Sequence, residues 1–206
     1  TILYNRMIHP LLGFPIKGVI WYQGESNANS AAQATDYRPL FQKLITSWRR
    51  EWRGSNPEFP FLWVQLPDYG TVDSVPPAAS AWATVRESQT AALSLPHTGQ
   101  VVAIDLGQAE ELHPRNKQDV AARLALKARE VAYGQRIVSS GPTYLRHSVN
   151  AGRVTIELAN VGGGLVSRAG GGAIPGFTIA GDDRTFVWAD AKVEGNRVIV
   201  WSDRVP

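Results

Sequence analysis

Three short apolar runs constrain the fold of this chain more than any other feature of its sequence. The runs are "IKGVIWYQ", "PFLWVQL" and "GQVVAID". Each is apolar without alternation and enriched in β-branched or aromatic residues, as expected of strands buried on both faces. A segment with helical spacing of apolar residues follows each run, and this order predicts a parallel sheet with helices on both faces.

The three helices following these runs have recognisable ends. We expect the first over "DYRPLFQKLITSWRREW", residues 36–52, with Asp36 as its N-cap. The second is expected from about Ala81 to Leu95, capped by Ser80, and the third over "RNKQDVAARLALKAREVAYG", closed by Gly134. The arginines of "WRREWR" are expected on the solvated face of the first helix.

The hydrophobic pattern of the sequence changes at about Ser139. Segments such as "GRVTIELANV" and "NRVIVWSD" alternate and are separated by Gly, Asn and Asp, as in antiparallel strands. We therefore expect an α/β domain portion over residues 1–138 and a small, truncated β-rich region over 139–206. At 206 residues the chain is long enough for one full domain or one large and one small.

Composition excludes several classes of site. The chain has no cysteine, which removes disulfides, thiolate metal sites and a cysteine nucleophile. No histidine pair has helical metal-ligand spacing and no Asp-rich calcium loop is present, so we expect no metal or cofactor. The 21 basic and 18 acidic residues are spread along the chain, which gives no reason to expect nucleic acid. No run of about eighteen apolar residues predicts a membrane span.

The stretch "QGESN" directly follows the first buried run and carries more polar side chains than a turn needs. In parallel sheets, ligands lie outside the carboxyl ends of the strands, so the loops 23–35, 67–80 and 106–114 are the candidates for a site. The Gln23 amide and a backbone N–H beside Gly24 can form an oxyanion hole. Alternatively, Glu25 and Ser26 cap the next segment while Gln23 holds the turn.

His113 follows the third run, in "DLGQAEELHPRNKQ", immediately before a helix. A histidine at the carboxyl edge of a sheet is placed as a general base should be. Glu110 or Glu111, within three positions, is predicted to orient the imidazole and stabilise its charged form. The alternative is a His-Pro loop whose acidic residues favour the positive end of the helix.

Three spaced motifs together resemble a known family. "MIHPLLGFPIKGVIWYQGESN", "WATVRESQ" and "ELHPRNKQDVAARLALKA" are similar to segments of sialate O-acetylesterases and related carbohydrate acetylesterases of the SGNH hydrolase superfamily, and the β-rich tail resembles theirs as well. The resemblance implies a flavodoxin-like, three-layer α/β/α fold, incomplete in this chain. It also implies an enzyme that removes O-acetyl groups from sialic acid or other sugars through a serine acyl-enzyme, in the periplasm or secreted.

The resemblance also implies residue roles. His113, in a His-Pro-x-x-Lys context, matches the family's catalytic histidine, while Gln23 and Gly24 match its Gln-Gly-Glu motif. Gln23 is then an oxyanion-hole donor and Glu25 a positioning residue. The orienting acid is usually an aspartate three positions before the histidine, where this chain has Glu110. In some esterases it lies two positions before, at Glu111.

The family's nucleophilic serine lies in a Gly-Gln-Ser-Asn turn that this sequence lacks. Ser26 lies in Gly-Glu-Ser-Asn, which does not match the Gly-x-Ser-x-Gly elbow. We therefore expect a C-terminal portion of a larger esterase, inactive alone, whose serine comes from an N-terminal segment or another chain. The alternative is a non-catalytic carbohydrate-binding or accessory module that uses some of the seven tryptophans.

Overall fold

The computed structural model describes residues 2–52, 58–71, 74–76, 79–168 and 170–205. The chain divides into two units, Thr1–Thr71 with Ser80–Ser139, and Val72–Ala79 with Ser140–Pro206. The segment 72–79 belongs to the second unit, whereas the sequence placed it in a loop of the α/β portion. Each unit is described below by itself.

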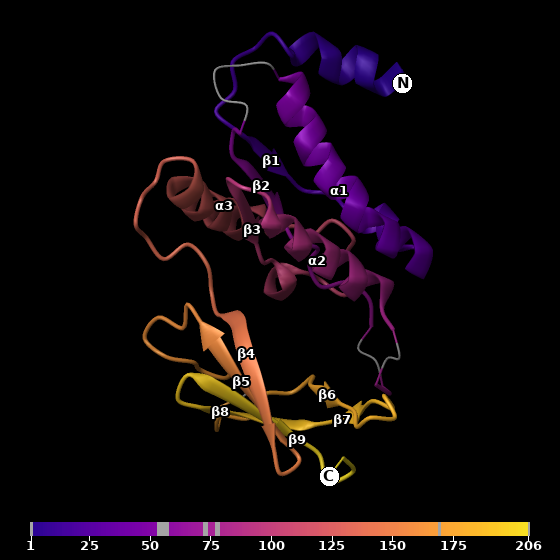
Figure 1. Ribbon diagram of the computed structural model, residues 1–206, viewed down its shortest axis with the longest axis vertical. Coiled ribbons are helices and arrows are strands. Elements are labelled where there is room, and N and C mark those ends of the chain that lie inside the picture. Colours follow the sequence, from indigo (N-terminus) through magenta and orange to yellow (C-terminus); the bar gives the residue numbers. More distant parts are fainter. Residues whose placement is uncertain (1, 53–57, 72–73, 77–78, 169, 206) are drawn as a thin grey trace. The chain divides into compact units, whose positions relative to one another are not determined.

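A parallel sheet forms the centre of the first unit (Figure 1). Its strands are β1 (Val19–Trp21), β2 (Phe61–Val64) and β3 (Thr98–Val101), in the order β1-β2-β3. Ile20 is paired with Leu62, and Leu62 with Gly99. The three predicted strands and their parallel arrangement are confirmed. Because all three run in the same direction, their carboxyl ends meet at one edge.

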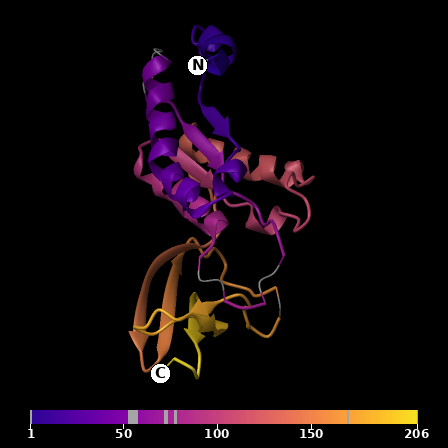
Figure 2. The same cartoon turned by 90° about the vertical axis from the view of Figure 1, so that its right-hand side faces the viewer.

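Three α-helices cover the sheet: α1 (Ala31–Glu51), α2 (Ala81–Ala91) and α3 (Lys117–Val131). In β2, Phe61 and Trp63 pack in the same core as residues of α1 and α2, whereas Val64 packs with Val120 of α3. Alternate residues of a strand face opposite sides, so α1 and α2 lie on one face and α3 on the other. Figure 2 shows this layering.

Short helical segments join these elements. They are η1 (Tyr4–Ile8), a π-helix, and the 3₁₀ segments η2 (His9–Leu11), η3 (Glu25–Ala28), η4 (Ala92–Ser94) and η5 (Ile104–Leu106). The predicted Ser80 cap is confirmed, because its side chain accepts a hydrogen bond from Ala83 N at 3.2 Å. The predicted Asp36 cap is wrong. Helix α1 begins earlier, capped by Ser30, since Ser30 Oγ accepts from Gln33 N and the intervening alanines favour helix.

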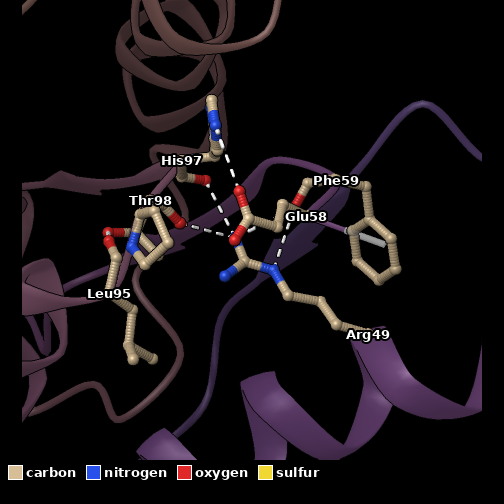
Figure 3. A network of polar contacts seen from close by, with 7 residues as sticks. Arg49, Glu58, Phe59, Leu95, His97 and Thr98 are labelled. Atoms are coloured by element: carbon tan, nitrogen blue, oxygen red, sulfur yellow. Dashed lines mark hydrogen bonds and ion pairs between the residues drawn. The ribbon is translucent and has the colours of Figure 1, made fainter. Parts of the chain in front are cut away.

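The arginines of "WRREWR" were expected on the solvated face of the first helix. For Arg49, near the end of α1, this is wrong, because its side chain is only 7% exposed. Figure 3 shows its guanidinium among main-chain carbonyls at the amino ends of β2 and β3. It donates to Phe59 O at 3.0 and 3.1 Å, to Pro96 O at 2.8 Å and to His97 O at 3.2 Å. Burial lowers the pKa of Arg49. The side chain thus fastens the sheet edge opposite the predicted site.

The second unit is antiparallel, as the alternating sequence predicted. Its main sheet has the order β4-β5-β9-β8, and β6 pairs with β7. Ala191, Val198 and Val200 form the centre of its core. The strands are β4 (Thr143–Asn150), β5 (Arg153–Ala159), β6 (Thr178–Ile179), β7 (Val187–Trp188), β8 (Asp190–Glu194) and β9 (Arg197–Trp201).

No helix among the described residues is both long enough and apolar enough to cross a membrane.

Candidate functional site

The polar motifs predicted from the sequence leave the sheet at the same edge. Gln23 to Glu25 follow β1, and His113 lies in the segment between β3 and α3. Since β1, β2 and β3 are parallel, both motifs are at the carboxyl edge, where ligands bind in sheets of this kind. The topology therefore agrees with the expected location of a site.

Gly24 occupies a position that requires glycine. Its φ is +153°, and the residue is buried. A Cβ there would lie 3.2 Å from Leu66 Cδ2 and 3.3 Å from both Gln89 Nε2 and Val85 Cγ1. Its N–H donates to the Glu25 carboxylate at 2.9 Å. In this conformation, the N–H expected to serve an oxyanion hole is therefore engaged by the neighbouring side chain.

Gln23 is held with its amide in a defined orientation. Its Nε2 donates to Asn27 Oδ1 at 3.0 Å, while the Tyr37 hydroxyl lies 3.3 Å from Gln23 Oε1 and 3.2 Å from Gln23 O. Because the tyrosine donates to the carbonyl end, the amide N–H end is directed to the other side. One hydrogen of Nε2 is used by Asn27, and an amide nitrogen has a second to donate.

Gln89 also belongs to this region, although it was not among the site residues predicted from the sequence. It is fully buried on α2. Its Oε1 accepts from Leu66 N at 3.0 Å, and its Nε2 donates to Gln23 O at 3.2 Å. One side chain thus joins the loop after β1 to the loop after β2. The available signal was position, since Gln89 lies four residues after buried Val85 on the apolar face of the helix.

Arg86, on α2, binds main-chain carbonyls of the loop after β2. Its Nε donates to Leu66 O and its Nη2 to Pro67 O, both at 3.0 Å. Burial lowers the pKa of Arg86, and the charge of Asp68 opposes this. Arg86 therefore shapes the loop that follows β2.

The loop after β2 and the loop after β3 are in close contact. Gly70 N donates to Ala109 O at 2.9 Å. A Cβ on Gly107 would lie only 2.2 Å from Asp68 O, so this close approach requires glycine. The segment leading to His113 is thus supported by its neighbour.

His113 itself is exposed, and Pro114 after it is buried. Glu111 Oε1 accepts a hydrogen bond from the main-chain N–H of His113 at 3.0 Å. Within the described residues, neither Glu111 nor the exposed Glu110 bonds to the imidazole ring. A hydrogen bond from Glu110 or Glu111 to the imidazole of His113 therefore stays a prediction, and Glu111 binds the main chain of His113.

A contact between Lys117 and Tyr22 joins the segment of His113 to the segment of Gln23 at the carboxyl edge of the sheet. Lys117 Nζ lies 4.7 Å from the centre of the Tyr22 ring. Tyr22 directly precedes Gln23, and Lys117 begins α3 four residues after His113. Burial, with a smaller contribution from the charge of Glu25, raises the pKa of Tyr22. The start of α3 therefore lies beside the end of β1.

Two cavities in the described residues lie away from these motifs. One, of about 230 Å³, lies between the N-terminal helical segment and α1. The other, of about 370 Å³, lies in the second unit and is lined by Gly181, Asp182, Asp183, Thr185, Val187, Arg204 and Val205. Convergence of Gln23, Glu25 and His113 in a single pocket stays a prediction.

Tyr37 is expected to make the stability of the first unit sensitive to alkaline pH. Burial raises the pKa of Tyr37 from 10.0 to about 12. A raised tyrosine pKa favours the neutral phenol in the folded state, so stability present below pH 10 is lost as the pH rises toward 12, by about 2 kcal/mol. Urea unfolding at a series of pH values should show this loss in the wild type.

The Tyr37→Phe variant should lack that component of the pH dependence. The exposed Tyr133 offers a matched control, and Tyr133→Phe should follow the wild-type curve. Equal pH dependence in the wild type and Tyr37→Phe would contradict this account of Tyr37.

Comparison with known proteins gives consistent matches. The family model described as carbohydrate esterase, sialic acid-specific acetylesterase matches residues 2–129. Sialate O-acetylesterase from Mus musculus is 40% identical over 158 residues, which cover 69% of this chain and 28% of that protein. Sialate O-acetylesterase from Homo sapiens is 39% identical, covering 69% of this chain and 29% of its own length.

A solved structure is also similar. A novel carbohydrate acetylesterase from Xanthomonas citri has 48% sequence identity and a TM-score of 0.89. The alignment covers 98% of this chain and 46% of that chain. The present chain thus spans less than half the length of each of these relatives.

Proposed function

This chain belongs to the sialic acid-specific acetylesterase family of carbohydrate esterases, and from that premise we propose that it is part of an esterase that removes O-acetyl groups from sialic acid or other sugars. The strongest support is that Gln23 and His113 follow parallel strands and so lie at the same edge of the sheet. The substrate would be an acetylated carbohydrate, and the nucleophilic serine would come from a segment outside this chain.

In this mechanism His113 is the general base. Its imidazole takes the proton of the serine hydroxyl while the serine oxygen attacks the acetyl carbonyl. Collapse of the tetrahedral intermediate breaks the bond to the sugar oxygen, which leaves with the proton from the imidazolium. Water, deprotonated by the same histidine, then hydrolyses the acetyl-serine. The exposure of His113 in this structure leaves its ring accessible for these steps.

Gln23 would stabilise the oxyanion of both tetrahedral intermediates. Its Nε2 keeps one hydrogen beyond the bond to Asn27, and Tyr37 holds the other end of the amide. A donor fixed before the reaction loses little free energy on reorganisation, which is why such groups are effective. Glu25 is the positioning residue, because its carboxylate holds the N–H of Gly24.

The orienting acid is better assigned to Glu110 than to Glu111. Glu111 already accepts the main-chain N–H of His113. Glu110 is exposed and has no hydrogen bond within the described residues, so its carboxylate is available to the imidazole. Glu111 would then set the conformation of the loop.

The alternative, a non-catalytic carbohydrate-binding module, has weaker support. Trp21, Trp48 and Trp63 pack in the core of the first unit. In the second unit, Arg153 lies 5.0 Å from the centre of the Trp201 ring and so occupies one of its faces. Trp188, 41% exposed, remains as an aromatic surface for a sugar.

The proposal predicts that the 206-residue chain alone does not hydrolyse 4-nitrophenyl acetate above background. A complete chimera should be active. In it, this chain replaces the matching part of the solved acetylesterase relative, which supplies the rest of the fold. Replacing by alanine the serine that the family carries in a Gly-Gln-Ser-Asn turn should lower kcat by several orders of magnitude.

Ser26→Ala in the same chimera is the matched control and should leave kcat unchanged, since Ser26 lies outside any nucleophile-elbow pattern. Robust hydrolysis by the isolated chain, abolished by Ser26→Ala, would overturn the proposal and identify Ser26 as the nucleophile.

A further inference from the structure

The side-chain amide of Gln89, on α2, is fully buried and directed at main-chain groups. Its Oε1 accepts from Leu66 N at 3.0 Å, while its Nε2 donates to Gln23 O at 3.2 Å and to Val64 O at 3.5 Å. An amide nitrogen has two hydrogens, so both of them are used. One side chain thus binds the last residue of β2, the loop after β2 and the loop after β1.

The amide does more than fill space in the core. Gln89 follows the fully buried Val85 by one helical turn, and Gly24 packs against both side chains. Burying an amide costs free energy that its hydrogen bonds offset, and an apolar side chain of the same shape can be nearly as stabilising. The specific effect of an amide at this position is therefore to fix where the main chain of Gln23 lies.

The main chain of Gln23 in turn determines where its own side chain begins. The Tyr37 hydroxyl lies 3.2 Å from Gln23 O and 3.3 Å from Gln23 Oε1, and Gln23 Nε2 donates to Asn27 Oδ1 at 3.0 Å. Tyr37 and Asn27 hold the amide of Gln23, whereas Gln89 holds its carbonyl from α2. A shift of this carbonyl would move the amide nitrogen, and a displacement of about 1 Å near a reacting group can lower a rate about 10²-fold.

We propose that Gln89 is a positioning residue of the esterase: through the carbonyl of Gln23, it holds the Gln23 amide where the oxyanion of the tetrahedral intermediates forms. The inference rests on the proposed function for the oxyanion role of Gln23, but not for the positioning itself. Because the oxyanion is absent from the bound ester, loss of this position should lower kcat and leave KM nearly unchanged.

The first measurement follows the position of Gln23 without reference to activity. Gln89→Met keeps a side chain of similar length and removes the amide. In the ¹⁵N-labelled 206-residue chain, the side-chain NH₂ signals of Gln23 are identified by their loss in Gln23→Ala. We expect these signals to shift in Gln89→Met, because the hydrogen bond from Gln23 to Asn27 changes when the main chain moves.

Gln42→Met is the matched control. Gln42 lies on α1, and its Nε2 donates to Ala91 O at 3.3 Å, so this substitution also removes an amide bonded to a main-chain carbonyl. It should leave the Gln23 signals and kcat unchanged. Circular dichroism checks that each variant is folded. If Gln89→Met is unfolded, Gln89→Asn, which draws the amide back by one methylene, takes its place with the same expected result.

A double-substitution cycle in the esterase chimera tests the consequence for catalysis. We expect kcat to fall about 10²- to 10³-fold in Gln23→Ala and about 10- to 10²-fold in Gln89→Met, with KM within about threefold. Adding Gln89→Met to Gln23→Ala should lower kcat by less than about twofold more. A positioning residue has no further effect once the group that it positions has been removed.

The outcomes separate positioning from function. Additive losses of kcat in the cycle, or Gln23 signals that stay in place in Gln89→Met, would overturn the proposal and leave Gln89 a residue of the core. Equal losses of kcat in Gln89→Met and Gln42→Met would overturn it as well. If the Gln23 signals move but Gln23→Ala leaves kcat unchanged, the positioning stands and the oxyanion role in the proposed function fails.

Discussion

Replacing His113 by alanine in the complete esterase chimera is expected to lower kcat by about 10⁴- to 10⁶-fold. The imidazole is the group assigned to accept the proton of the nucleophile and return it to the leaving sugar oxygen. Without it, the serine hydroxyl at neutral pH is a weak nucleophile, and only the oxyanion hole and substrate binding accelerate the reaction. Steady-state hydrolysis of an O-acetylated sugar measures the effect.

The second unit offers a matched control in His147. This histidine is exposed on β4, with its Nδ1 2.8 Å from the Tyr144 hydroxyl. His147→Ala should change kcat by less than about twofold, because substitutions of exposed residues usually have small effects. The KM of His113→Ala should also stay close to that of the unsubstituted chimera. Retention of activity by His113→Ala would exclude this histidine from the mechanism. The loop 106–114 would then no longer be assigned to the active site.

Replacing Arg49 by alanine is expected to lower the free energy of unfolding by about 3 kcal/mol or more, since charged hydrogen bonds are lost and buried acceptors are left unpaired. The guanidinium contacts the carbonyls of Phe59, Pro96 and His97, directly before β2 and β3. The Phe59 carbonyl accepts from both Nε and Nη2, so it would lose two donors at once. Urea denaturation of the 206-residue chain, followed by tryptophan fluorescence, reports on this core.

The adjacent Arg50 provides the control variant for this experiment. Its side chain is 72% exposed and pairs with neighbouring Glu51 at 3.1 Å. Arg50→Ala should change the free energy of unfolding by less than about 0.5 kcal/mol, as exposed ion pairs contribute little. Arg49→Lys should fall between the two, because one ammonium group cannot match the planar fork of the guanidinium. Equal losses for Arg49→Ala and Arg50→Ala would show that the carbonyl contacts do not stabilise the sheet.

The sequence by itself determined the layers of the first unit. Burial of a whole strand demands continuous apolar residues, and burial of one helix face demands helical spacing, so both leave a pattern that can be read without coordinates. The parallel direction followed from the alternation of strands and helices. This alternation also placed Gln23 and His113 at one edge, since parallel strands share their carboxyl ends.

Only the tertiary structure decided which polar groups meet. Gln89 and Arg49 lie on helices whose sequence gives no partner for them, and their acceptors come from distant loops. Glu110 or Glu111 was predicted to orient the imidazole of His113, and the structure adds that Glu111 binds the main-chain N–H of His113. Hydrophobic periodicity records which face of an element is buried, because burial depends on area and not on direction. A hydrogen bond depends on the distance and angle between two particular atoms, and those are set only when the loops are packed.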